Sequence, residues 1–149
     1  MIYTFLPKKT CEELLDSRTV GVRLSHNKKT ECIPEGRGKI LLLAPYKKEK
    51  AEKKLSRRAF FLLVREMVRS AKSAGGKRLA FDFSLLAGVA PDLTREEAAE
   101  SMGTHIEMAN YEFITYKTRP ATGWDMLEEV SILGPLSQRE KSAFLRGTI

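Results

Sequence analysis

Hydrophobic and polar positions recur along this chain with two different periods, one typical of strands and one typical of helices. Residues 20–25 alternate with the two-residue period of a strand, and residues 39–45 form a continuous apolar run. Such a run is typical of a central strand that is covered on both faces. The predicted strands are residues 2–6, 20–25, 39–45, 77–83 and 129–133. Residues 26–38 are interpreted as a polar connection and residues 85–91 as a loop, because turn-forming residues interrupt both.

The longest predicted helix covers residues 51–74. Its apolar residues recur at steps of three and four, which places them on one face of a helix. They are Leu55, Ala59, Leu62, Leu63, Met67, Ala71 and Ala74. Gly75 and Gly76 follow directly, and glycine after a helical pattern predicts that the helix ends there.

Two further helices carry the signature of a capping box, in which a Ser or Thr is followed three residues later by Glu. One begins after Thr94 with Glu97 as its partner, and the other after Ser137 with Glu140. Gly103 lies inside the first of these helices at a cost of about 1 kcal/mol relative to alanine, so we expect close packing there. The buried stripe predicted for this helix consists of Ala98, Met102, Ile106, Ala109 and Phe113.

Strands and helices alternate in this order, which favours an α/β fold with a layered, mixed sheet flanked by helices. The chain has 149 residues, of which 42% are hydrophobic and 30% charged. That length and composition predict a single soluble domain spanning residues 1–149, with its own core. No apolar run is long enough to span a bilayer, and residues 1–9 lack the order of a secretory signal. We therefore expect a cytoplasmic protein.

Few residues suggest chemistry. The two histidines, His26 and His105, have no cysteine or second histidine at the spacing of a metal site. Cys11 and Cys32 are interpreted as reduced, structural thiols. Neither a nucleophile elbow nor a glycine-rich loop opening a helix is present. Asp82 lies near the end of a predicted strand, where a structural hydrogen bond is its expected role. The sequence accordingly predicts no catalytic, metal-binding or cofactor-binding residue.

The formal net charge is +7, and much of it falls on one side of the helix predicted at residues 51–74. Charge without interleaved aromatic side chains supports only weak, salt-sensitive nucleic-acid binding. We therefore expect a solvent-exposed helix face and no sequence-specific nucleic-acid site. The residues of this face are Lys54, Arg57, Arg58, Arg65, Arg69 and Lys72.

The second half of the chain resembles the N-terminal domain of leucyl aminopeptidases (cytosol aminopeptidases, peptidase family M17). Residues 96–100 read Glu-Glu-Ala-Ala-Glu, residues 111–113 read Tyr-Glu-Phe, and residues 116–118 read Tyr-Lys-Thr. In that family a similar pattern closes the N-terminal domain and is followed by a polar loop, a strand and a helix. Residues 118–125, 129–133 and 137–149 fit these three in order. The resemblance covers roughly residues 78–149 and gives Tyr111, Phe113, Tyr116 and Lys117 a structural role.

This resemblance implies a noncatalytic, macro-domain-like module with an assembly or regulatory role. The parent protein would release N-terminal residues with two divalent metals, Zn or Mn, held in a C-terminal catalytic domain that this chain lacks. The family also implies that catalytic domain as a partner and a homo-hexameric parent. Because the chain ends inside a predicted helix, we expect a chain cut near the domain boundary or a separately encoded remnant.

Two alternatives from other classes stay open. One is a macro-like module that binds a nucleotide, ADP-ribose or nucleic acid. Its glycine-rich loop would have to be residues 86–89, Leu-Ala-Gly-Val, which match poorly. The other is a purely structural or oligomerisation module.

Overall fold

One antiparallel and four parallel strand pairs join six strands into a single mixed sheet. The computed structural model describes residues 1–26, 29–45, 55–90, 92–111, 117–121 and 123–149. The spatial order of the strands is β1-β6-β5-β2-β4-β3. The bounds are β1 Ile2–Leu6, β2 Thr19–Leu24, β3 Glu31–Glu35, β4 Gly38–Leu43, β5 Arg78–Asp82 and β6 Glu129–Leu133. This arrangement confirms the predicted α/β class.

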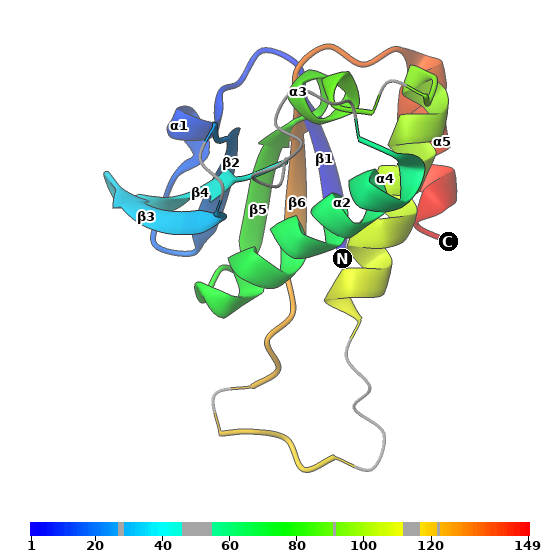
Figure 1. The fold of residues 1–149 in the computed structure, drawn as a ribbon. Helices are drawn as coiled ribbons and strands as arrows, with labels where there is room; N and C mark the ends of the chain where they lie inside the picture. The colour runs from blue at the N-terminus through cyan, green and yellow to red at the C-terminus, as the bar shows by residue number, and fades with distance from the viewer. Residues whose placement is uncertain (27–28, 46–54, 91, 112–116, 122) are drawn as a thin grey trace.

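Helices cover the two faces of the sheet unequally. The bounds are α1 Cys11–Leu14, α2 Arg57–Ser73, α3 Phe83–Gly88, α4 Arg95–Asn110 and α5 Gln138–Gly147. Helices α2 and α4 cross in front of the strands and α5 packs beside α4, whereas the short α1 lies against the opposite face (Figure 1). The large core therefore lies on the side of α2, α4 and α5.

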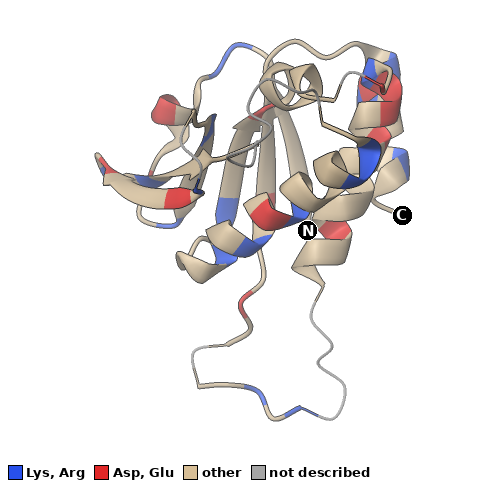
Figure 2. Cartoon of the chain, viewed as in Figure 1, with Lys and Arg blue, Asp and Glu red and all other residues tan. Residues whose placement is uncertain are grey.

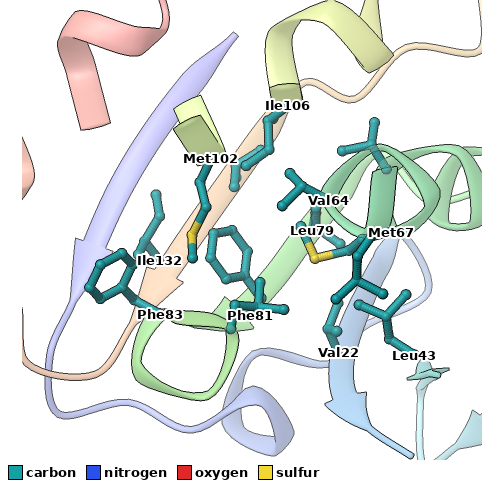
Figure 3. Packing of buried hydrophobic residues seen from close by; sticks show 14 of the residues in the cluster. Val22, Leu43, Val64, Met67, Leu79, Phe81, Phe83, Met102, Ile106 and Ile132 are labelled. Atoms are coloured by element: carbon teal, nitrogen blue, oxygen red, sulfur yellow. The ribbon is translucent and has the colours of Figure 1, made fainter. Parts of the chain in front are cut away.

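The main core forms because inward-facing residues of parallel strands meet the apolar stripes of the long helices. Phe81 and Ile132 project from the sheet toward Met102 of α4, and Leu79 lies beside Val64 of α2 (Figure 3). All five side chains are fully buried. A second, smaller cluster on the other face consists of Cys11, Ala80 and Leu133, with Leu6 and Leu14 packed against it.

Two segments predicted as connections contain regular structure. Residues 26–38 were expected to be a polar connection, but they include β3, which pairs antiparallel with β4 through a tight turn at Gly36, where φ is +56°. The strand is polar because it forms the edge of the sheet and is mostly exposed. Residues 85–91 were expected to be a loop, but α3 occupies most of this segment. Asp82 starts that helix by accepting bonds from the backbone N–H groups of Ser84 and Leu85.

Helices α2 and α4 begin or end at residues other than those predicted, and the buried face of α2 differs in part from the predicted one. Helix α2 begins at Arg57, where the Ser56 side chain accepts the N–H of Ala59; residues 51–54 lie outside the described part. Leu62 was placed on the buried stripe but is 50% exposed, because the stripe is centred on Phe60, Val64, Met67 and Val68 instead. Helix α4 ends at Asn110, and Phe113 lies outside the described residues.

Both capping boxes are present as the sequence predicts, at Thr94 with Glu97 and at Ser137 with Glu140. The packing expected at Gly103 is also confirmed. A Cβ atom at Gly103 would overlap the backbone carbonyl oxygen of Phe144 in α5, and one at Gly147 would overlap that of Glu100 in α4. The two helices therefore touch backbone to backbone through one glycine from each.

We expect Gly103→Ala to lower the free energy of unfolding by about 1–3 kcal/mol or more, because neither helix backbone can move away without disturbing the core. Gly88→Ala is the matched control, since nothing lies within 4 Å of a Cβ atom there. Urea denaturation of both variants measures the difference. Equal midpoints for Gly103→Ala and the unsubstituted chain would show that α4 and α5 do not approach this closely.

Candidate functional site

The cations predicted to form one basic face divide into two groups in the structure. Arg57, Arg58 and Arg69 are exposed on α2. Arg65 and Lys72 are half-buried against α4, which differs from the solvated face expected for them. Lys54 lies outside the described residues. Figure 2 shows the basic positions spaced along α2 with a single acidic one, Glu66, among them.

Arg65 connects the two long helices through an imidazole ring. Its Nε donates to Nδ1 of His105 at 2.9 Å, and a second nitrogen contacts the Met108 sulfur at 3.5 Å. The Phe61 ring stacks on His105 with centroids 4.4 Å apart. A guanidinium only donates, so Nδ1 must be unprotonated and His105 neutral. Burial, with a smaller contribution from the Arg65 charge, lowers the pKa of His105 below its ordinary value of 6.5.

The stacked pair changes the interpretation of the basic face. The sequence suggested that no aromatic side chain lies among the cations, but Phe61 lies beside Arg65. Lys72 contacts the last carbonyl groups of α4, at Ala109 and Asn110, each at 3.4 Å. A cation is favourable there because the free carbonyls at a helix C-terminus carry partial negative charge.

Asn110 fixes the base of the connection between α4 and β6. Its Oδ1 accepts the N–H of Leu127 at 2.7 Å, and its Nδ2 donates to the Leu127 carbonyl at 3.1 Å. The side chain is buried, so both bonds form away from water. Lys77 adds a bond to the carbonyl of Trp124 at 2.9 Å. Residues 117–121 lie away from the body of the domain (Figure 1).

The residues of the family-like motif lie on this connection. Tyr111 follows the last turn of α4 and is 66% exposed, and Lys117 is also exposed. Phe113 and Tyr116 fall outside the described residues. The structure therefore does not bring Tyr111 into the core, and the residue that anchors this segment is Asn110. No local sequence pattern distinguishes Asn110 from the other polar residues of this helix.

A second polar contact holds α4 against the edge of the sheet. The Tyr3 hydroxyl of β1 donates to Glu107 of α4, and the Tyr3 ring meets Phe144 of α5 edge-on at 5.3 Å. Burial, followed by the hydrogen bond to the Glu107 carboxylate, raises the pKa of Tyr3. Because the two residues lie 104 positions apart, no sequence spacing could indicate the pair.

The carboxyl ends of β2 and β5 are where an open α/β sheet usually binds a ligand, since the connections diverge there. The cavity at this point has a volume of only about 10 Å³. Its lining consists of Val22, Leu24, Phe81, Asp82, Leu85 and Leu86. The Asp82 side chain caps α3, which confirms its predicted structural role.

The cysteines and the possible metal ligands of the described residues do not form a common site. Cys11 and Cys32 are free, the first buried and the second exposed. The Cys11 thiol contacts the carbonyls of Val22 and Ala80. Within the described part of the chain, no group of three His, Cys, Asp or Glu residues could hold a metal ion. Among the same residues, no helix has the length and apolar character needed to cross a membrane.

Solved structures share this fold. A mutant of tomato leucine aminopeptidase superposes with a TM-score of 0.70 and 12% identity, over 99% of this chain and 35% of that one. The domain has the fold of one part of leucine aminopeptidase. The bottromycin maturation enzyme BotP, solved in complex with Mn, superposes with a TM-score of 0.60 and 15% identity, over 88% of this chain and 29% of that one. No protein-family model and no curated protein sequence matches the chain.

The chain thus spans about a third of the length of each structural relative. This proportion fits the single domain expected from the sequence resemblance. At these identities the likeness establishes the fold, and the activity of the longer proteins does not transfer with it.

We expect acidification to destabilise the domain through His105. Its pKa is lower in the folded chain, so the unfolded chain takes up the proton first, and the free energy of unfolding falls as pH drops below about 6.5. NMR titration of the His105 ring protons should give a pKa below 6.5. His105→Gln should flatten the dependence of stability on pH in this range. A His105 pKa at or above 6.5 would contradict the observed acceptor role of Nδ1.

We expect Asn110→Ala to lower the free energy of unfolding by about 2 kcal/mol or more, because it leaves the N–H and carbonyl of Leu127 buried without their partner. Hydrogen exchange at Leu127 should accelerate at the same time. Ser101→Ala, a half-buried site on the same helix, is the control and should change stability by less than about 0.5 kcal/mol. Unchanged exchange at Leu127 would mean that another contact closes the connection.

Proposed function

We propose that this chain is the noncatalytic N-terminal domain of a leucyl aminopeptidase-like protein, with an assembly or regulatory role. One observation carries the proposal: the fold matches 99% of this chain but only 35% of tomato leucine aminopeptidase. The family-like pattern at residues 96–118 supports the same assignment independently of the superposition. The remaining two thirds of such a protein would contain the catalytic and metal-binding residues.

The carboxylates of the domain support a noncatalytic role. Hydrolysis with two metals requires acidic side chains that converge on ions about 3.5–4 Å apart. Here several acidic residues are held in ion pairs with arginines instead. Examples are Asp16 with Arg78 at 2.6 Å and Glu140 with Arg95 at 2.7 Å. The two divalent ions, Zn or Mn, would therefore be bound by the catalytic domain, which is also the first partner of this chain.

The alternative of a macro-like nucleotide-binding module has weaker support. Such a module needs an open crevice at the carboxyl ends of the strands, and the cavity found between β2 and β5 has the size of one water molecule. Residues 86–89, the only candidate for a glycine-rich loop, lie mostly within α3 and in its C-cap. We therefore retain the macro-like description for the architecture only, and place the parent in the cytoplasm as a homo-oligomer.

Recovery and assay of the native protein test the proposal. An antibody against residues 1–149 should recover a chain about three times as long as this one, since the domain covers 35% of its structural relative. The recovered protein should release leucine from a leucyl chromophore, lose this activity in a chelator, and regain it with Mn²⁺ or Zn²⁺. The purified 149-residue chain should show no such activity with either metal.

Two results would overturn the proposal. The first is a native antigen of 16.8 kDa that has no associated leucyl-releasing activity. The second is metal-dependent activity of the purified 149-residue chain that scales with its concentration.

A further inference from the structure

Five arginines outside α2 each form an ion pair with a carboxylate. The pairs are Arg18–Glu128, Arg23–Glu12, Arg78–Asp16, Arg95–Glu140 and Arg146–Glu100. Among the described residues, no carboxylate forms an ion pair with Arg58, Arg65 or Arg69 of α2. The charge of these three arginines is therefore not neutralised by an ion pair among the described residues.

These arginines lie on one stripe of α2 together with an apolar side chain. Arg58, Leu62, Arg65 and Arg69 are spaced by four, three and four residues, which keeps them within a sector of about 60° on a helix. The stripe is about 16 Å long. We name the surface formed by these four residues and Met108 of α4 the basic ridge.

Large apolar side chains are exposed at the centre of the basic ridge. Leu62 is 50% exposed and Met108 is 54% exposed. The Arg65 side chain lies against Met108, so the two helices contribute to one continuous surface. The Phe61–His105 stack beneath Arg65 holds that side chain in place. Methionine and arginine are both enriched at protein–protein interfaces.

We propose that the basic ridge is a docking surface for an acidic, amphipathic protein segment, with Leu62 and Met108 receiving its apolar side chains and Arg58 and Arg69 binding its carboxylates. A guanidinium can donate two parallel hydrogen bonds to a carboxylate. Among the described residues neither Arg58 nor Arg69 forms an ion pair, although Glu31 of β3 lines the same surface cavity as Arg69. The stripe is as long as about three turns of a docked helix. This inference does not depend on the domain being joined to a peptidase.

Charge and shape favour a protein segment over nucleic acid. Leucine and methionine offer no aromatic platform for bases, and one face of Phe61 is covered by His105. The exposed cations of α2 are all arginines, the residue type enriched at protein interfaces, whereas lysine is depleted there.

Three synthetic 18-residue peptides test the proposal with the purified chain. The first alternates glutamate with leucine at helical spacing, the second replaces every leucine with serine, and the third replaces every glutamate with lysine. We expect only the first to bind measurably in calorimetry. Its NMR shift changes should be concentrated on α2 and on His105 and Met108 of α4. The serine peptide should bind at least about tenfold more weakly, because it retains the charge but has no apolar anchor.

Matched variants test whether peptide binding depends on the basic ridge or on exposed leucine and arginine side chains in general. Leu62→Ser should weaken binding of the glutamate–leucine peptide about tenfold, whereas Leu85→Ser, at an equally exposed leucine of α3, should not. Arg58→Ala with Arg69→Ala should also weaken binding about tenfold, whereas Arg139→Ala, an exposed arginine of α5, should not. Thermal unfolding of each variant establishes that it is folded before binding is measured.

Three outcomes would overturn the proposal. The first is no binding of the glutamate–leucine peptide at 1 mM. The second is binding whose shift changes lie outside α2 and α4, or that is equally affected by the Leu85 and Arg139 variants. The third is tighter binding of duplex DNA or single-stranded RNA than of the peptide, through the same arginines and with sequence preference at 200 mM salt. That third result would assign the basic ridge to nucleic acid instead.

Discussion

Parallel pairing constrains this domain more than any other interaction. Each parallel connection must cross a face of the sheet, so the chain returns from β4 to β5 through α2 and from β5 to β6 through α3 and α4. Because those crossings share one face, the apolar stripes of α2 and α4 meet the same strands, and Phe81 lies fully buried in the cluster that both helices form with the sheet. Helix α5 then packs against α4 at the distance that Gly103 and Gly147 permit. Of the helices in the described part of the chain, the four-residue α1 is the one that packs against the remaining face.

The two sides of the sheet differ in which polar groups are buried and in which arginines form ion pairs. On the packed side, Asn110 connects α4 to Leu127, and the Tyr3 hydroxyl connects β1 to Glu107 of α4. Along the outer stripe of α2, Arg58, Arg65 and Arg69 form no ion pair with a carboxylate among the described residues. On the opposite face, by contrast, Arg78 lies among Asp16 and Glu129.

The described acidic residues bear on the proposed function through the contacts that they make. Several of their carboxylates serve as caps and ion-pair partners: Asp82 caps α3, and Glu140 both caps α5 and binds Arg95. The proposed function rests on the similarity of this fold to one part of leucine aminopeptidase, and the proposed docking surface rests on the exposed arginines and apolar side chains of the basic ridge.

The sequence by itself determined the α/β class, five of the six strands and both capping boxes, because periodicity and caps are local properties of a few neighbouring residues. Close packing at Gly103 was also predictable, since a glycine inside a helix has a local cost that only a neighbour can offset. Tertiary structure alone decided that the polar segment before β4 becomes an edge strand, because its partner supplies the pairing that its composition does not indicate. It also decided that Leu62 points outward, since the position of the sheet, and not the spacing of apolar residues, selects which face of α2 is buried. Contacts such as Tyr3 with Glu107 and Asn110 with Leu127 depend on how distant segments are superposed, and no local pattern encodes that superposition.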